Sequence, residues 1–258
     1  MTSLSEKMKV MSPADIKIYN SGESAIFCSL GEEISPGVYS RVNDFEKFIK
    51  QLDLQGIIET VPSYSGLMIY YNPGLLERET LVNAVNRFQL SGNMEPDEKQ
   101  MPGVVVPVCY GGMYGPDLQH VAEQCSLEPD EVISIHSSVS YLIYMLGFTP
   151  GFPYLGGMDS RISTPRKDDP ALSVPAGSVG IAGDQTGIYP VASPGGWQII
   201  GRTPVTLFNP SLESPFLFEP GMRVTFRSVS ADEFRVITEQ VANGSYITET
   251  ENRNGEGE

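Results

Sequence analysis

The chain has 258 residues, a length that fits one large domain or two of moderate size. Apolar residues make up 40% of the sequence and charged residues 19%, which is enough apolar material for packed cores. The 32 acidic and 17 basic residues give a formal net charge of −15. A surface this acidic repels nucleic-acid phosphates and anionic lipid headgroups, so we expect no nucleic-acid and no membrane partner.

The cysteine pattern and the N-terminal sequence indicate a cytoplasmic protein. Cys28, Cys109 and Cys125 are widely separated and match neither a disulfide framework nor a zinc-binding spacing. The N-terminal residues MTSLSEKMKV lack the apolar stretch of a signal peptide. No segment approaches the roughly 18 apolar residues that a membrane-spanning helix needs. We therefore expect a cytoplasmic globular protein with no metal site.

The first hundred residues combine strand and helix patterns. A helix is predicted from Pro36, because apolar residues such as Val38, Val42 and Phe45 recur at helical spacing, and Gly56 ends it. Strands flank this helix and a second helix follows, so the predicted order is ββαββα. This order is typical of an α+β domain with helices on one face of a sheet. The remaining predicted features are strands at 16–18, 24–30, 57–61 and 66–71, a helix at 78–90, a polar linker at 91–101 and domain bounds at 12–95.

The second half of the chain favours short strands. Between Gly147 and Pro204, 11 of 58 residues are glycine and 8 are proline, which excludes long helices. Aromatic and β-branched residues run through the same segment, so we predict short strands and tight turns, as in a small barrel. Upstream, helices are predicted to begin at 115–117 and 128–130. The remaining predicted features are strands at 103–109, 139–146, 188–192, 197–201, 204–208 and 222–227, a mainly-β domain at 101–230 and a disordered acidic tail at 246–258.

The usual signatures of phosphate binding and hydrolysis are missing from the sequence. It has no GxxxxGK[ST] loop, no GxGxxG motif after a strand, no HExxH and no GxSxG. The two histidines are His120, expected on a solvated helix face, and His136 near a helix end. His136 is either a cation that interacts with the helix end or a general acid or base. Both interpretations stay open at the level of sequence.

Polar and aromatic side chains within the glycine-rich segment are the candidates for a ligand site. Arg166 and Arg202 can each hold a carboxylate or phosphate through two hydrogen bonds. Gln185 offers an amide donor, and Trp197 offers a flat apolar wall. The alternative is structural, with Trp197 in the core and each arginine in an ion pair. Because Arg202 follows an apolar run, its guanidinium is expected to be half-buried and to need an acidic partner or an anionic ligand.

Five motifs together resemble one protein family. They are YGGMYGPDL at 110–118, EVISIHSS at 131–138, YMLGFTPGFPYLGGMD at 144–159, TPR at 164–166 and PAGSVGIAGDQTGIYPVASPGGWQIIGRTP at 175–204. The family that they resemble is the B subunit of prokaryotic 5-oxoprolinase, also described as the kinase A inhibitor family and as allophanate hydrolase subunit 1. The resemblance covers residues 12–230, and the glycine and proline spacing of the longest motif makes it specific.

The resemblance implies a fold, a reaction and a set of partners. The implied fold is an α+β N-terminal domain followed by a mainly-β, cyclophilin-like barrel domain, and the chain would be one half of a split carboxyltransferase-type module. The C subunit of 5-oxoprolinase would be the other half, and the A subunit would complete the enzyme. The implied reaction is ATP-dependent opening of 5-oxo-L-proline to L-glutamate. Because this chain has no recognisable ATP site, ATP is expected partly or wholly on a partner.

The implied reaction gives the candidate residues their expected roles. A lactam site has to hold a small carboxylate, polarise a carbonyl group and exclude water. The arginines would hold anionic oxygens, the amide and nearby backbone would donate to the carbonyl, and the aromatic rings would form walls. The expected catalytic residues are His136, Arg166, Gln185 and Arg202, and the expected substrate-binding residues are Tyr154, Tyr189, Gly195, Gly196 and Trp197.

Two alternatives to this function remain at the level of sequence. Some relatives are expected to bind a sensor histidine kinase and to inhibit its autophosphorylation, in which case the same cleft, or the rim beside it, would hold a kinase helix. The second alternative is a component of an allophanate hydrolase or of a urea-amidolyase-type carboxyltransferase. Neighbouring genes for the C and A subunits would favour 5-oxoprolinase over the kinase inhibitor.

Overall fold

The chain divides into two compact units, Met1–Glu98 and Lys99–Glu258. Each unit has its own hydrophobic core. The linker predicted at 91–101 lies outside the described residues from position 92 onward. The computed structural model describes residues 15–32, 35–91, 103–147 and 149–251.

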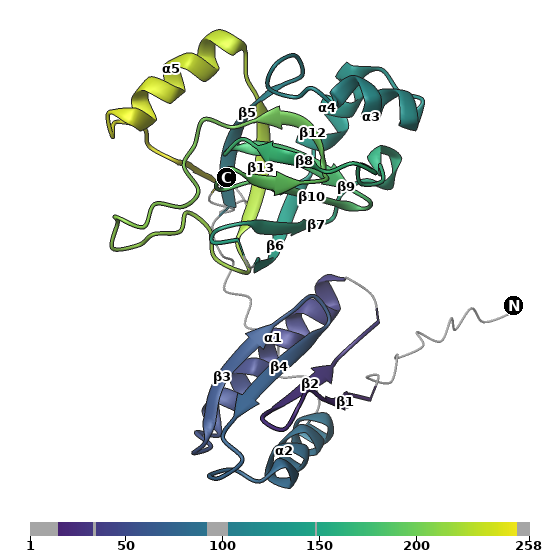
Figure 1. The fold of residues 1–258 in the computed structure, drawn as a ribbon, viewed down its shortest axis with the longest axis vertical. Coiled ribbons are helices and arrows are strands. Elements are labelled where there is room, and N and C mark those ends of the chain that lie inside the picture. The colour runs from purple at the N-terminus through teal and green to yellow at the C-terminus, as the bar shows by residue number, and fades with distance from the viewer. Residues whose placement is uncertain (1–14, 33–34, 92–102, 148, 252–258) are drawn as a thin grey trace, which may run out of the picture. The chain divides into compact units, whose positions relative to one another are not determined.

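Unit 1 is a four-stranded antiparallel sheet with two helices packed on one face (Figure 1). Its elements are β1 (Lys17–Asn20), β2 (Ala25–Ser29), α1 (Pro36–Gln51), β3 (Ile57–Pro62), β4 (Gly66–Tyr71) and α2 (Arg78–Ser91). The strands lie in the order β1-β2-β4-β3. Ile26 and Ile69 of the sheet share a core with Phe45 and Phe88 of the helices, whose ring centroids lie 5.0 Å apart. The ββαββα element order is the one that the sequence predicts.

Local sequence explains where helix α1 begins and ends. Ser35 Oγ accepts a hydrogen bond from the Val38 backbone N–H at 3.3 Å, and Pro36 occupies the first turn, where its missing N–H needs no partner. At the other end, Asp53 adopts a positive φ of 46°, which the helix cannot continue through. The helix therefore ends before the predicted stop at Gly56.

Unit 2 contains a closed seven-stranded β-barrel. Its strands are β5 (Gly103–Tyr110), β6 (Ser140–Leu146), β7 (Pro153–Gly156), β9 (Ser178–Ala182), β10 (Gln185–Ile188), β12 (Gln198–Arg202) and β13 (Arg223–Ser228). They follow the order β12-β9-β10-β7-β6-β13-β5, and a further pairing of β12 with β5 closes the circle. Inward side chains such as Val106, Ile143, Ile181 and Phe226 fill the barrel. The predicted barrel is thereby confirmed, whereas its likeness to cyclophilin stays a prediction.

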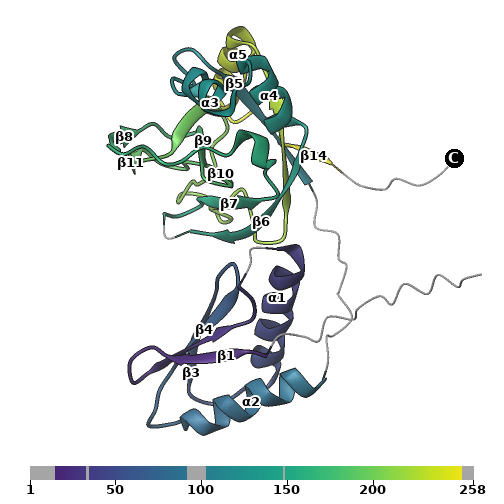
Figure 2. The same ribbon diagram turned by 90° about the vertical axis from the view of Figure 1, so that its right-hand side faces the viewer.

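Helices and short strands surround this barrel. They are α3 (Leu118–Cys125), α4 (Pro129–Ser137), the short helix η1 (Ser160–Ile162), β8 (Ala171–Val174), β11 (Ser193–Gly195), α5 (Ala231–Ala242) and β14 (Glu249–Glu251). Strands β8 and β11 pair with each other as a separate two-stranded sheet. Helices α3, α4 and α5 lie toward the same end of the barrel in both views (Figures 1 and 2). Among the described residues, no helix is both long and apolar enough to span a membrane.

Two strands that the sequence predicts in the glycine-rich segment are wrong. The strand expected at 188–192 is absent, because β10 ends at Ile188 and the chain then turns. The segment 204–208 contributes only an isolated bridge between Phe208 and Phe216. Strands β9 and β10 do form in this segment, and they pair with each other as a tight hairpin. The segment is therefore strand-rich, as expected, but its strands begin and end elsewhere.

The C-terminal part of the chain is more ordered than the sequence predicts. Helix α5 is an addition to the predicted elements, and Ser230 caps it by accepting a hydrogen bond from the Glu233 backbone N–H at 3.1 Å. The disordered tail predicted at 246–258 is wrong for Glu249–Glu251, because β14 pairs there with β5. Residues 252–258 of that tail lie outside the described residues.

Candidate functional site

An aromatic cluster of Phe152, Tyr154, Tyr189 and Trp197 lies on unit 2. The ring centroid of Phe152 lies 5.4 Å from those of Tyr189 and Trp197, with the rings nearly perpendicular. The Tyr154 and Trp197 centroids lie 6.4 Å apart. Edge-to-face contacts of this kind stabilise a fixed arrangement of rings. The structure thus brings together the three aromatic residues that the sequence analysis singled out as walls.

Two glycines allow the aromatic cluster to pack on the outside of the barrel. Gly180 of β9 and Gly187 of β10 are direct cross-strand partners. Ile181, next to Gly180, points into the barrel core, so the two glycines belong to the outer face. A Cβ atom at Gly187 would lie 2.9 Å from the Phe152 ring, and one at Gly180 would lie 3.1 Å from Trp197 Cβ. The glycines of the motif therefore let flat rings approach the sheet backbone closely.

Arg166 lies at the edge of the aromatic cluster. Its guanidinium carbon is 5.9 Å from the centroid of the Trp197 ring, a cation–π distance. The side chain is exposed and forms no ion pair within the part of the chain that the structure describes. Burial raises the pKa of Tyr189, and the positive charge of Arg166 partly offsets this effect. Phe152, Tyr189 and Trp197 are themselves buried, so Trp197 is a core residue, as the structural alternative expects, and the accessible groups of this set are Arg166 and the half-buried Tyr154.

Gly195, Gly196 and Gln185 border the aromatic cluster in different ways. A Cβ atom at Gly195 would lie 2.3 Å from Tyr189 Oη, so only glycine fits beside this ring. A Cβ atom at Gly196 would meet no atom closer than 3.5 Å. Gln185 is the cross-strand partner of Ala182, which packs within the cluster, so both residues belong to the same face of the sheet. A direct contact of these residues with substrate stays a prediction.

Arg202 is held by a backbone carbonyl group rather than by an acidic residue. Its Nε donates to the Ala176 carbonyl oxygen at 2.8 Å. The side chain is half-buried, as expected, and among the described residues it makes no ion pair. The terminal guanidinium nitrogens therefore keep their capacity to bind an anion. That Arg202 shares a cleft with Tyr189 and Gln185 stays a prediction.

His136 belongs to the barrel core and not to the site. Its side chain is fully buried and stacks on Phe226, with ring centroids 4.5 Å apart. Thr186 Oγ1 donates to the Gly180 carbonyl (3.0 Å), so it accepts from His136 Nε2–H (2.9 Å), and His136 Nδ1 accepts from the Tyr110 hydroxyl (2.8 Å). Burial lowers the pKa of His136 to about 3. A neutral, fully buried imidazole contacts no substrate, so its assignment as a general acid or base is corrected.

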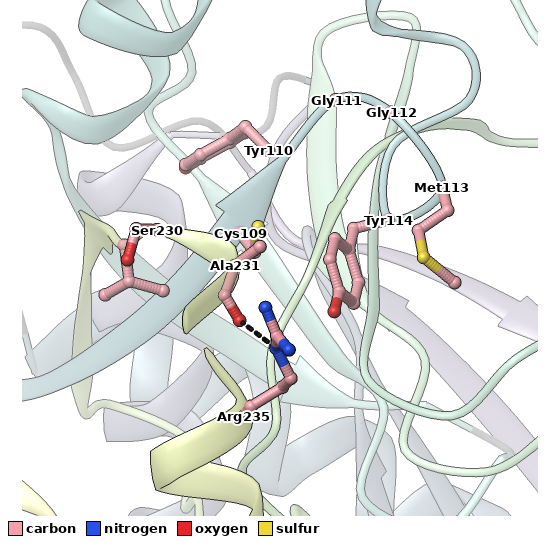
Figure 3. Close-up of a pocket in the computed structure, with 10 residues that line it drawn as sticks. Cys109, Tyr110, Gly111, Gly112, Met113, Tyr114, Ser230, Ala231 and Arg235 are labelled. Carbon is pink, nitrogen blue, oxygen red and sulfur yellow. Dashed lines mark hydrogen bonds between the residues drawn. The ribbon is translucent and has the colours of Figure 1, made fainter. Parts of the chain in front are cut away.

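A pocket of about 670 Å³ lies where the loop after β5 meets the start of α5 (Figure 3). Residues 109–114 form one side, and residues 229–231 with Arg235 form the other. The Tyr114 ring packs on Phe234, with centroids 4.4 Å apart, and Arg235 extends from α5 toward this ring. None of the residues that line this pocket is among the site residues predicted from the sequence, although the motif YGGMYGPDL marks the loop. Among the described residues, no group of His, Cys, Asp or Glu side chains is arranged to hold a metal ion.

The chain resembles proteins that share this sequence and fold. It matches the family model described as carboxyltransferase domain, subdomain C and D, over residues 16–218. It is 42% identical over 228 residues to the B subunit of 5-oxoprolinase from Bacillus subtilis, covering 85% of this chain and 95% of that protein. A crystal structure of a conserved uncharacterized protein from Pyrococcus horikoshii is 43% identical, with a TM-score of 0.51 over 84% of this chain and 100% of that one.

A more distant structure shares the fold alone. The urea amidolyase of K. lactis is 19% identical, with a TM-score of 0.77 over 92% of this chain, and this chain spans 16% of that protein. The family match and the identity to the Bacillus subtilis protein both extend over both units of the chain. The chain therefore belongs to the carboxyltransferase domain, subdomain C and D, family, in which it is a homologue of the B subunit of 5-oxoprolinase.

Proposed function

We propose that this chain is the B subunit of a cytoplasmic, ATP-dependent 5-oxoprolinase that opens 5-oxo-L-proline to L-glutamate together with the A and C subunits. The observation that carries this proposal is the 42% identity to the Bacillus subtilis protein over nearly the whole length of both chains. The exposed Arg166 at the edge of the aromatic cluster supports it, because an accessible cation beside aromatic rings suits a ligand with one carboxylate.

The residues of the aromatic cluster receive distinct roles in this function. 5-Oxoproline is a small, nearly flat lactam that carries one carboxylate. Arg166 binds that carboxylate, the half-buried ring of Tyr154 contacts one lactam face, and the buried Trp197 ring supports Arg166 through the cation–π contact. Arg202, whose terminal nitrogens have no acidic partner in the described part of the chain, is the second candidate for an anionic oxygen.

We assign ATP to the partner subunits, because the most plausible phosphate-binding segment of this chain does not fit a triphosphate. Strand β5 is followed by a glycine-containing loop and by helix α3, an order that in nucleotide-binding proteins places phosphates at a helix N-terminus. Here Asp117 occupies that N-terminus, and the loop contains no lysine. The Asp117 carboxylate accepts from the Ile199 backbone N–H and from Lys167 Nζ, so the nearby cation is already paired with an acidic side chain. We therefore propose that ATP activates the lactam carbonyl at a site on the A and C subunits.

Reconstitution of the complex tests the proposed function. The chain is co-expressed with the A and C subunits encoded in the same genome, and release of glutamate and ADP from 5-oxoproline is measured. We expect both products in equal amounts from the complete complex and none when this chain is omitted. A complete, stable complex that hydrolyses urea-derived amides but not 5-oxoproline contradicts the proposal.

The kinase-inhibitor alternative is tested with the same preparation. The isolated chain is added to purified sensor histidine kinases from the source genome, and autophosphorylation is followed with labelled ATP. We expect no change in the phosphorylation rate. Inhibition at stoichiometric concentrations, together with an inactive reconstituted complex, would replace the enzymatic function by the inhibitory one.

A further inference from the structure

We infer that Asp117 is a positioning residue that holds Arg166 over Trp197. It does so through Lys167, the residue after Arg166, and through the backbone of Ile199 in β12. This role rests on the proposed function, in which Arg166 binds the substrate carboxylate. Asp117 itself would not contact the substrate.

Asp117 stands at a helix start but does not cap the helix. Aspartate at this position ordinarily accepts a hydrogen bond from a backbone N–H of the first helical turn. In α3 the Asp117 side chain makes no such bond. Its Oδ2 instead accepts from the Ile199 backbone N–H and from Lys167 Nζ, both at 2.7 Å. The carboxylate therefore links the start of α3 to β12 and to the segment that carries Arg166.

The two neighbours of Arg166 are both tied to residues beside Trp197. Gln198 Nε2 donates to the Pro165 carbonyl oxygen at 3.0 Å, and the Lys167 backbone N–H donates to the Gly196 carbonyl oxygen at 2.7 Å. The ion pair of Lys167 with Asp117 is the third link. The Arg166 guanidinium carbon lies 5.9 Å from the Trp197 ring centroid. Its position consequently depends on the links at Pro165 and Lys167.

Burial distinguishes the Asp117–Lys167 pair from other ion pairs of unit 2. The Lys167 and Asp117 side chains are 27% and 17% exposed. The arginine side chains of the pairs Arg161–Asp159 and Arg235–Asp232 are 67% and 69% exposed. Solvent and salt screen a partly buried pair less than an exposed one. Loss of the Asp117–Lys167 ion pair should therefore produce a measurable change at Arg166, the residue before Lys167.

The intrinsic fluorescence of the isolated full-length chain provides the test, because Trp197 is its one tryptophan. The Arg166→Ala variant first gives the emission maximum and the acrylamide quenching of Trp197 in the absence of the Arg166 guanidinium. We expect Asp117→Asn and Lys167→Met to shift both quantities at least halfway toward the Arg166→Ala values. Lys167→Arg, which keeps a cation, should retain the wild-type spectrum. Asp168→Asn is the matched control, since Asp168 is exposed, directly follows Lys167 and has no ion pair among the described residues.

The reconstituted complex gives a second readout. Asp117→Asn should raise KM for 5-oxoproline about two- to fivefold with kcat unchanged, which corresponds to about 0.4–1 kcal/mol of lost binding. Lys167→Arg, which keeps a cation opposite Asp117, should show the wild-type KM for 5-oxoproline. A merely structural ion pair would lower the unfolding temperature without separating KM from kcat.

The outcomes distinguish the positioning role from the proposed function. If Asp117→Asn and Lys167→Met keep the wild-type fluorescence while unfolding at lower temperature, Asp117 is a structural residue and the positioning role is wrong. If Asp117→Asn does not fold, the Lys167→Met and Lys167→Arg pair decides in the same way. If the spectra shift as expected but the complete complex leaves 5-oxoproline intact, the positioning role stands and the proposed function fails.

Discussion

Arg166 is a residue at which ligand binding and folding can be separated. Its side chain is exposed, and an exposed cation–π contact contributes about 0.5–1 kcal/mol, so Arg166→Ala should lower stability by no more than this. In the proposed function Arg166 binds the substrate carboxylate, so loss of this charged hydrogen-bond donor should raise KM of the complex about tenfold or more. Steady-state kinetics and thermal unfolding measure the two effects. Arg161→Ala, at an exposed arginine paired with Asp159, should leave KM unchanged, and equal losses in both variants would contradict the assignment.

His136 should make the stability of the chain depend on pH, because the pKa of its imidazole is about 3 in the folded chain and the ordinary value is 6.5. Below about pH 6.5 the unfolded chain takes up a proton that the folded chain does not. The contribution of His136 to the free energy of unfolding is therefore fully present above the ordinary pKa of 6.5. It is lost as the pH falls from there toward the pKa of about 3 in the folded chain. The loss from this residue should be about 1.4 kcal/mol per pH unit within that window.

Proton NMR of the imidazole measures this prediction directly. In a His120→Asn variant, His136 supplies the one remaining imidazole signal, and His120 is exposed, so the substitution leaves the core intact. We expect the chemical shift of His136 to stay constant from about pH 8 to about pH 4 while the chain remains folded. A titration near the ordinary value would show that the ring is accessible and would reopen a role in proton transfer.

At the scale of elements, local signals and distant contacts explain what the sequence can and cannot predict. Helix α1 is predictable because Ser35, Pro36 and the apolar spacing all lie within the helix or beside it. Strand β9 is not, because all five of its residues are buried and give no alternating pattern. The sequence misassigns His136 because its partners Tyr110 and Thr186 are far away along the chain. The aromatic cluster can be predicted by residue type, but not its support by the glycines of β9 and β10.

Strand β11 ends beside the aromatic cluster, and its last residue tests how tightly the two pack. A Cβ atom at Gly195 would lie 2.3 Å from Tyr189 Oη, so Gly195→Ala should displace the Tyr189 ring and lower stability by about 1–3 kcal/mol. Gly196→Ala is the matched control, since its Cβ would meet no atom closer than 3.5 Å. Urea unfolding and Trp197 fluorescence should change in the first variant and not in the second. Equal tolerance of both substitutions would mean that the cluster rearranges freely.

At the scale of the whole molecule, unit 1 offers a surface that suits the proposed role within a complex. The strand register places Tyr19, Phe27, Met68 and Val61 in one row across all four strands. Their neighbours Ile26, Cys28, Leu67 and Ile69 face the helices, so this row, which we call the apolar row, lies on the opposite face of the sheet. Tyr19 is 52% and Val61 42% exposed. Exposed apolar side chains that form a continuous row are typical of a protein–protein interface.

The apolar row predicts that the C subunit stabilises this chain when the two bind. A partner at a hundred times its Kd raises the free energy of unfolding by about 2.7 kcal/mol, so the C subunit should raise the melting temperature of the wild-type chain. Val61→Lys places a charge within the apolar row and should reduce both this rise and the binding heat. Leu90→Lys, at an 87% exposed position of α2, should behave like the wild type. If calorimetry detects no binding of the wild-type chain at micromolar concentrations, the role within the complex is wrong, and if the two variants bind equally well, the contact lies outside the apolar row.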